Sequence, residues 1–138
     1  MNERARLLLN QALREVPNKS RAVVLIECAR LEEYVGQIEK ARLFLKRAQQ
    51  EAKHEWKVFL EAILLEMRAG DMRRAIEEAE TALDIRRGTG RLWAVLIQLK
   101  HIDGEEEQLK VFKEALEEVP KSGEVWCEGA RIRLNPLS

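Results

Sequence analysis

The chain has 138 residues, of which 46% are hydrophobic and 35% are charged, and this length suffices for one domain with a modest core. Lysine plus arginine and aspartate plus glutamate each number 24, so no global field draws the chain to nucleic acid or to an anionic membrane. The charge is unevenly spread, because residues 1–60 hold 12 basic and 8 acidic side chains and residues 61–138 hold 12 and 16.

Good helix formers dominate the whole chain, and apolar residues recur at the i, i+3, i+4 and i+7 spacing of amphipathic helices. This pattern predicts helices at 2–16, 20–35, 37–52, 55–69, 71–87, 90–102, 105–118 and 122–134. No stretch alternates as a strand would, and no apolar run approaches the roughly 20 residues of a membrane span. We therefore expect an all-α protein without a membrane partner.

Three glycines, Gly36, Gly70 and Gly104, are spaced by 34 residues and interrupt the helical pattern each time. The same residue classes recur at fixed offsets from them. A large apolar residue comes before each glycine and small or apolar residues follow it: Leu25, Phe59 and Trp93; Ala41, Ala75 and Leu109; Ala48, Ala82 and Leu116, with Ala115 one place earlier in the third unit. A period near 34 with two helices per unit is typical of a helical solenoid, with each glycine closing a helix in a left-handed conformation.

The two ends of the repeat region also match, because "ALREVP" ends at Pro17 and "ALEEVP" ends at Pro120. The chain is thus predicted to hold a half-repeat, three full repeats and a further half-repeat. The predicted fold is a right-handed superhelical solenoid of antiparallel helix pairs with about 3.5 to 4 repeats over residues 1–138. A closed antiparallel bundle is the alternative, although it would not require the same residue class at the same offset from each turn.

The repeated pattern resembles the tetratricopeptide repeat (TPR), and more closely its half-a-TPR (HAT) variant. The aromatic place near the start of the first helix is held by Leu25, Phe59 and Trp93, with Trp126 opening the last unit; the glutamate place seven residues on is held by Glu32 and Glu66. "KARLFLKRA" at 40–48 fits the second HAT helix. Lys100, Leu109 and Arg133 depart from the HAT pattern, which keeps plain TPR open for the C-terminal half.

The resemblance implies a function. HAT proteins are scaffolds in RNA-processing assemblies, and "SGEVWCEGARIRLNP" is similar to the repeats of splicing factors that bridge the tri-snRNP. It therefore implies a non-catalytic protein–protein scaffold in a nuclear pre-mRNA splicing assembly, with a ribonucleoprotein subunit, peptide or helix as partner. The alternative is a TPR adaptor, unrelated to RNA and cytoplasmic, that binds a peptide or helix in its concave groove.

Candidate chemistry is sparse. The carboxylates of 76–80 and 103–108 fit polar faces and helix starts, with Asp103 and Glu105 to Glu107 predicted as first-turn charges that favour the helix dipole. His54 and His101 have no second ligand at metal spacing, and the common nucleotide-binding and hydrolase motifs are missing. We expect no catalytic residues, no cofactor and no metal. Direct nucleic-acid binding is disfavoured because basic side chains are interleaved with acidic ones and the aromatics occupy packing positions.

A partner of a solenoid is expected along the first helices of the pairs, where groove residues are apolar in the middle and charged at the rims. The predicted groove positions are Ile26, Arg30, Glu33, Lys57, Leu60, Leu64, Met67, Arg91, Gln98, His101 and Arg131, with Val23 at one end. Packing between neighbouring first helices is an equally open role for them. The carboxylate clamp of chaperone-binding TPRs is a poor fit, because its places read Ile26, Arg30, Glu61, Arg91 and Val95 and lack asparagine.

The ends suggest a fragment of a longer repeat array, because the chain begins within a second helix and stops after a first helix. An apolar stripe would then be partly uncovered at Val125, Trp126, Ala130 and Leu134, so a homodimer through this uncapped C-terminal end is the competing expectation. Cys28 is predicted to be a small core residue, and Cys127 to be more exposed.

Overall fold

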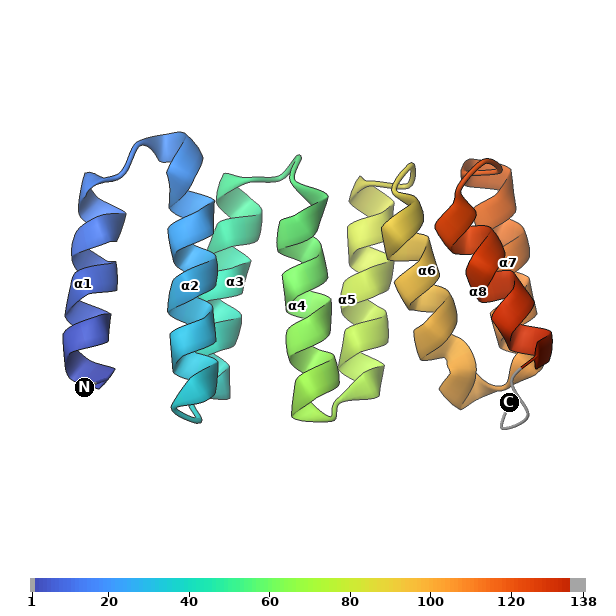
Figure 1. Ribbon diagram of the computed structural model, residues 1–138, viewed down its shortest axis with the longest axis horizontal. Helices are drawn as coiled ribbons and strands as arrows, with labels where there is room; N and C mark the ends of the chain where they lie inside the picture. The colour runs from blue at the N-terminus through green and yellow to red at the C-terminus, as the bar shows by residue number, and fades with distance from the viewer. Residues whose placement is uncertain (1, 135–138) are drawn as a thin grey trace. The chain divides into compact units, whose positions relative to one another are not determined.

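The computed structural model describes residues 2–134, which form eight α-helices and no strand (Figure 1). Chain contacts group into two compact units, Met1–Ala69 and Gly70–Ser138. The first unit holds α1 (Asn2–Glu15), the 3-10 turn η1 (Asn18–Ser20), α2 (Arg21–Tyr34), α3 (Ile38–Glu51) and α4 (Trp56–Ala69). The second holds α5 (Met72–Ile85), α6 (Gly90–Leu99), the 3-10 turn η2 (Lys100–Asp103), α7 (Glu105–Glu118) and α8 (Gly123–Leu134). We call α2, α4, α6 and α8 the A helices and α1, α3, α5 and α7 the B helices.

The predicted helices are all present, and most bounds agree within two residues. The exception is the sixth, predicted to run to residue 102, which ends at Leu99 and tightens into η2. The prediction that Asp103 lies in the first turn of the next helix is therefore wrong. Gly104, with φ of 99°, separates Asp103 from that helix, whereas Glu105 to Glu107 occupy its first turn as predicted.

The repeated glycines make the turns that end the A helices. Gly36, Gly70 and Gly104 have φ of 85°, 84° and 99°, and no other described residue has a positive φ. At the first turn Gln37 N–H donates to the carbonyl of Glu32 at 2.7 Å, and Gly36 N–H donates to that of Glu33 at 3.0 Å. This bond pair is a Schellman motif, which requires a left-handed residue at the glycine position. The predicted role of these glycines is confirmed.

The core of the first unit lies between A and B helices, where small side chains allow close approach. Ala41 and Ala48 of α3 are fully buried, and Leu25 of α2 and Phe59 of α4 hold the two large positions. One cluster combines Leu25 and Cys28 with side chains of the flanking helices, so the predicted core role of Cys28 is confirmed. Each helix pair thus buries its apolar stripe on its neighbours within the unit.

The second unit repeats this packing around Trp93, which is 2% exposed and whose Nε1 donates to the carbonyl of Arg87 at 2.7 Å. Trp126 makes the equivalent bond to Pro120, at 2.8 Å, but is 53% exposed. This exposure agrees with the prediction that Trp126 belongs to a partly uncovered stripe, and α7 contacts the ring at one edge through Phe112, 5.7 Å between ring centroids.

The predicted uncovered stripe on α8 is only partly present. Val125 is fully buried, which contradicts its place in that stripe, because α8 turns it toward the core of the second unit. Ala130 is exposed and so is Cys127, as predicted for that cysteine. The side chain of Leu134 lies outside the described residues.

Candidate protein-interaction surface

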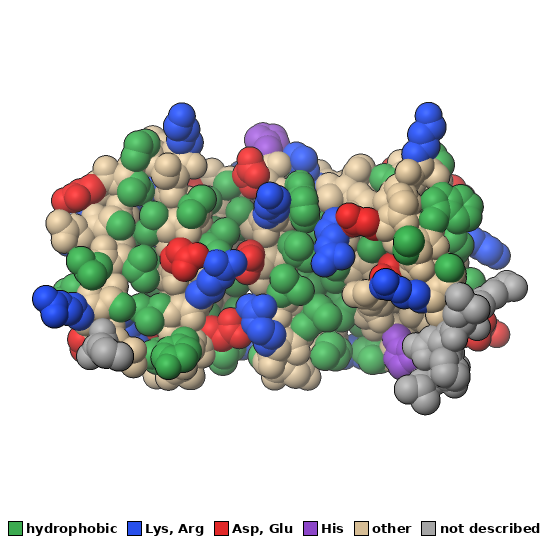
Figure 2. Space-filling model, viewed as in Figure 1, with side chains coloured by type: hydrophobic (Ala, Val, Ile, Leu, Met, Phe, Trp, Pro, Cys, Tyr) green, Lys and Arg blue, Asp and Glu red, His purple; other side chains and the backbone are tan. Residues whose placement is uncertain are grey.

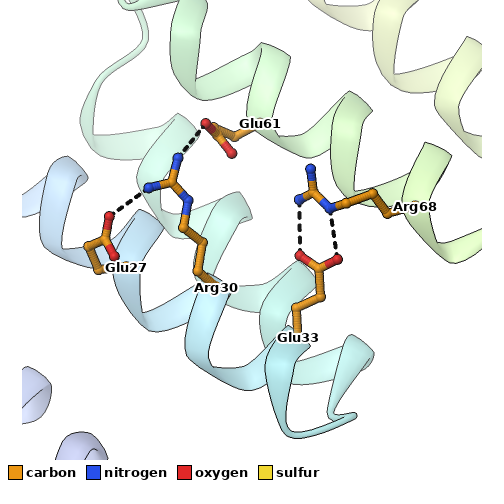
Figure 3. Close-up of polar contacts among 5 residues, drawn as sticks. All are labelled: Glu27, Arg30, Glu33, Glu61 and Arg68. Carbon is orange, nitrogen blue, oxygen red and sulfur yellow. Dashed lines mark hydrogen bonds and ion pairs between the residues drawn. The ribbon is translucent and has the colours of Figure 1, made fainter.

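Two A helices of the first unit, α2 and α4, are joined on their solvent side by a chain of charges (Figure 3). Arg30 of α2 donates to Glu27 one turn earlier at 2.7 Å and to Glu61 of α4 at 2.9 Å. Its guanidinium therefore bridges the two helices and is neutralised by two carboxylates. The predicted groove residue Arg30 thus serves as a contact between neighbouring A helices.

A second link lies further along the same helices. Arg68 of α4 donates to both carboxylate oxygens of Glu33 on α2, at 2.8 and 2.9 Å (Figure 3). This two-bond geometry is the strong form of an arginine–carboxylate pair, and the hydrogen bond to Glu33 raises the pKa of Arg68. Sequence reasoning placed Glu33 in the groove but missed Arg68, which stands 35 residues away in the chain.

The apolar groove candidates lie between and beside these links. Ile26 of α2 and Leu60, Leu64 and Met67 of α4 are all half-buried, whereas Val23 and Lys57 are exposed. Figure 2 shows hydrophobic side chains among the red and blue ones over these two helices. The surface is therefore mixed, with part of each apolar side chain open to a partner and the rest in contact with the protein.

In the second unit the predicted groove residues are all exposed: Arg91, Gln98, His101 and Arg131. Glu128 of α8, only 7% exposed, brings two of them together. It accepts a hydrogen bond from Gln98 of α6 at 2.9 Å and one from Arg131 at 2.6 Å. Arg91 lies at the start of α6 and His101 lies in η2, and neither shares in this link.

Sequence reasoning missed Glu128, although a signal for it was present. The same position in three repeats, two residues after the large apolar place, is held by Glu27, Glu61 and Glu128. The first two are 34 residues apart, and the third follows after nearly two further periods. In both units a donor on one A helix reaches this glutamate on the next, from Arg30 to Glu61 and from Gln98 to Glu128. Aligning the acidic residues at this place, in addition to Glu32 and Glu66, would have identified the link.

The HAT glutamates have a different role, which joins B helices to the following A helices. Glu32 is 5% exposed and accepts two hydrogen bonds from Arg6 of α1, at 3.0 and 2.9 Å. Glu66 is 2% exposed and accepts two from Arg42 of α3, at 2.9 and 2.8 Å. These carboxylates are structural, because each is buried and held on both oxygens by an arginine.

The third glutamate place, occupied by Lys100, is organised differently. Arg73 of α5 donates to Asp103 at 2.6 and 3.2 Å, and Lys100 lies 3.8 Å from the same carboxylate. The bond from Arg73 lowers the pKa of Asp103. A B helix, α5, is thus again linked to the end of an A helix, α6, but here the carboxylate belongs to the 3-10 turn η2.

The described residues offer little for chemistry. Among residues 2–134 no three His, Cys, Asp or Glu side chains converge in a way that could hold a metal ion. Burial raises the pKa of the Cys28 thiol, which disfavours the reactive thiolate. In that same part of the chain, no helix combines the length and apolar character needed to cross a membrane.

These features define a helical-repeat protein of the TPR class. Three solved TPR structures share the fold. A TPR protein from Parabacteroides merdae has a TM-score of 0.67 and 17% identity, over 97% of this chain and 54% of that one, and a thermophilic TPR protein from Thermus thermophilus has a TM-score of 0.63 and 21% identity, over 94% of this chain and 72% of that one. The first TPR of Spaghetti (RPAP3), bound to an HSP90 peptide, has a TM-score of 0.60 and 17% identity, over 89% of this chain and 98% of that one. At these identities the likeness concerns the fold alone. It confirms the predicted all-α helical-repeat solenoid class.

The family follows from the sequence match. All of residues 1–138 match the family described as "PRP6, TPR-like domain", and the chain belongs to that family. It is also 63% identical over 91 residues to a TPR-containing protein of Dictyostelium discoideum, a match that covers 66% of this chain and 7% of that protein's length. The predicted TPR/HAT-like family is confirmed.

Proposed function

We propose that the chain is a non-catalytic scaffold that binds protein partners within an RNA-processing particle, such as the pre-mRNA splicing machinery. The observation that carries this proposal is the match to the PRP6 TPR-like domain along all 138 residues. The resemblance of the segment around Trp126 to tri-snRNP-bridging splicing factors supports the same assignment. A nuclear location follows from it and belongs to the same proposal.

We propose that the partner binds the solvent-facing side of the A helices α2 and α4, which we call the A-helix surface. The charged side chains that link α2 to α4 are already paired with one another, so a partner gains little from opposite charge there. The half-buried Ile26, Leu60 and Leu64 offer apolar contact between polar rims. Such a surface suits a partner helix with one apolar face, or an extended peptide with spaced apolar residues.

A peptide adaptor unrelated to RNA is the second candidate. The Spaghetti (RPAP3) TPR, which shares the fold, is bound to an HSP90 peptide. An acidic peptide terminus is a poor ligand for the corresponding surface of this chain, because Arg30 is already held by Glu27 and Glu61 and Val95 is buried. A less acidic peptide with apolar anchors remains compatible with the adaptor function.

The test is affinity purification of the tagged chain from nuclear and cytoplasmic extracts, followed by mass spectrometry. Val23→Glu places a charge on an exposed apolar position of the A-helix surface, and Ile85→Glu is the matched control on a B helix, where the isoleucine is also exposed. The scaffold proposal expects ribonucleoprotein subunits that are lost with Val23→Glu and retained with Ile85→Glu. A single peptide-bearing partner outside RNA processing supports the adaptor, and partners unaffected by Val23→Glu contradict the surface assignment.

A further inference from the structure

A hollow of about 220 Å³ lies on the other side of the first unit, between the B helices α1 and α3 with α2 as its floor. Its walls are Leu9, Leu31 and Phe44, the polar members are Asn10 and Lys40, and Cys28 and the Arg6–Glu32 pair complete the lining. The volume is below the roughly 300 to 1,000 Å³ of small-molecule sites. It is suited to one large side chain supplied by a protein segment.

Exposed leucines adjoin this hollow in the chain. Leu7 follows the lining residue Arg6 and is 67% exposed, and Leu43 precedes the lining residue Phe44 and is 66% exposed. The two leucines hold the same position in their repeats, counted from the B-helix alanines Ala12, Ala48, Ala82 and Ala115. In the second unit that position is occupied by Glu77 and Lys110. Apolar exposure at this place is thus particular to the first unit, and it occurs next in the chain to residues that line the hollow.

The net charge of the B helices also differs between the two units, being positive in the first and negative in the second. Helices α1 and α3 carry seven basic and four acidic side chains, whereas α5 and α7 carry four basic and ten acidic ones. Lys40 lines the hollow, and Arg47 follows the lining residue Phe44 by three positions on α3, which puts it on the same face of that helix. Neither cation forms an ion pair with a described residue. Two positive charges at the hollow are therefore available to an acidic partner.

We propose that this hollow is a docking site for an acidic protein segment that inserts one large apolar side chain between α1 and α3 and places carboxylates near Lys40 and Arg47. Leu7 and Leu43 extend the apolar contact on either side. The site goes beyond the proposed scaffold function, because it involves none of the exposed A-helix residues. It gives the first unit a second protein-binding surface. If no partner binds the A helices, the proposal for the hollow is unaffected.

An acidic peptide fits these observations better than RNA does. Single-stranded RNA needs exposed aromatic faces beside a strongly basic track. The only aromatic side chain of the lining, Phe44, is half-buried, and Arg6 is engaged by Glu32 and Glu3. The excess of three positive charges on α1 and α3 is also small for a nucleic-acid track.

The experiment uses a synthetic fluorescent peptide in which one phenylalanine is flanked on both sides by aspartate and glutamate, titrated with the full chain and followed by anisotropy. Two control peptides replace the phenylalanine by serine or the acidic residues by lysine. We expect each control peptide to bind at least about tenfold more weakly, since one loses the anchor and the other the charge complementarity. Equal binding of all three peptides would overturn the proposal.

Charge-reversal variants locate the site. Lys40→Glu with Arg47→Glu is expected to weaken the acidic peptide about tenfold, because two exposed charge interactions are each reversed. Lys110→Glu with Lys113→Glu makes the same change in charge on α7 and is expected to leave the affinity within about twofold. Thermal melting of both double variants checks that they fold, and all four lysines and arginines are exposed.

The apolar part is tested separately with Leu43→Ser, against Ile85→Ser as an exposed apolar control on α5. Only Leu43→Ser is expected to weaken the peptide, by about threefold to tenfold. An oligouridine that displaces the peptide more effectively than unlabelled peptide does would overturn the choice of partner in favour of RNA. If the chain associates with itself and the double variant Lys40→Glu with Arg47→Glu abolishes that association, the proposed acidic partner is overturned in favour of a second copy of the chain.

Discussion

Replacing Arg42 by methionine is expected to destabilise the first unit strongly, because it removes the cation that holds a buried carboxylate. The side chain of Glu66 is 3% exposed and that of Arg42 is 18% exposed, and two hydrogen bonds join them across α3 and α4. Methionine keeps most of the apolar stem of arginine but none of its donors. The change therefore isolates the guanidinium from the packing of the side chain.

The magnitude follows from burial. Removing one partner of a buried ion pair costs about 3 to 5 kcal/mol, since the remaining charge keeps its desolvation penalty. Arg42 is not fully buried, so we expect a loss of about 3 kcal/mol from the free energy of unfolding. Arg68→Met is the matched control, because Arg68 also makes two bonds to a glutamate but its side chain is 48% exposed and that of Glu33 is 21% exposed. For such a pair we expect about 1 kcal/mol or less.

Urea denaturation followed by far-UV circular dichroism measures both variants. The double variant Arg42→Met with Glu66→Met is expected to regain most of the loss, because apolar residues of similar volume can replace a buried pair at little cost. A loss for Arg42→Met no larger than that for Arg68→Met would refute the reasoning. So would a double variant as unstable as the single one, since the loss would then not come from the buried carboxylate of Glu66 that Arg42 had held.

Three further predictions concern the second half of the chain. Gly70→Ala is expected to cost about 1 to 2 kcal/mol because φ is 84° there, whereas Gly88→Ala, without a positive φ or a neighbouring atom within 4 Å, should cost nothing measurable by thermal melting. Arg73 lowers the pKa of Asp103, so this pair stabilises the fold above the ordinary aspartate pKa and that contribution is lost as the pH falls through the lowered value. A carboxyl titration by NMR should show the Asp103 pKa rise in Arg73→Met, and an unchanged value would contradict the contact. Acrylamide should quench Trp126, which is 53% exposed, so Trp126→Phe is expected to lower the quenching slope; an unchanged slope would mean that this ring is shielded in solution.

The repeat could be predicted because its signals are local. A helix is specified by apolar spacing within a few turns, and Gly36, Gly70 and Gly104 are needed wherever the chain must adopt a positive φ. The buried positions Leu25, Phe59 and Trp93 followed from the same period, since each repeat buries its large residue in the same surroundings.

Contacts between helices could not be predicted in this way. Glu33 could either be open to a protein partner or be paired with Arg68. The outcome depends on how far α4 is rotated and shifted against α2, and no window of sequence contains that information. Val125 shows the same limit, because its burial depends on which side of α8 faces the core of the second unit.

Local signals thus suffice to predict the helices, their turns, the repeat and, through the repeat, the family. Which charges neutralise one another depends on packing between helices. Arg30 on the A helices is paired with Glu61, whereas Lys40 on the B helices lines the hollow and is available to a partner. This difference is one of distance along the chain, because backbone conformation and helix amphipathicity are set by near neighbours. Pairing and exposure are set by residues about one repeat away that only packing brings together.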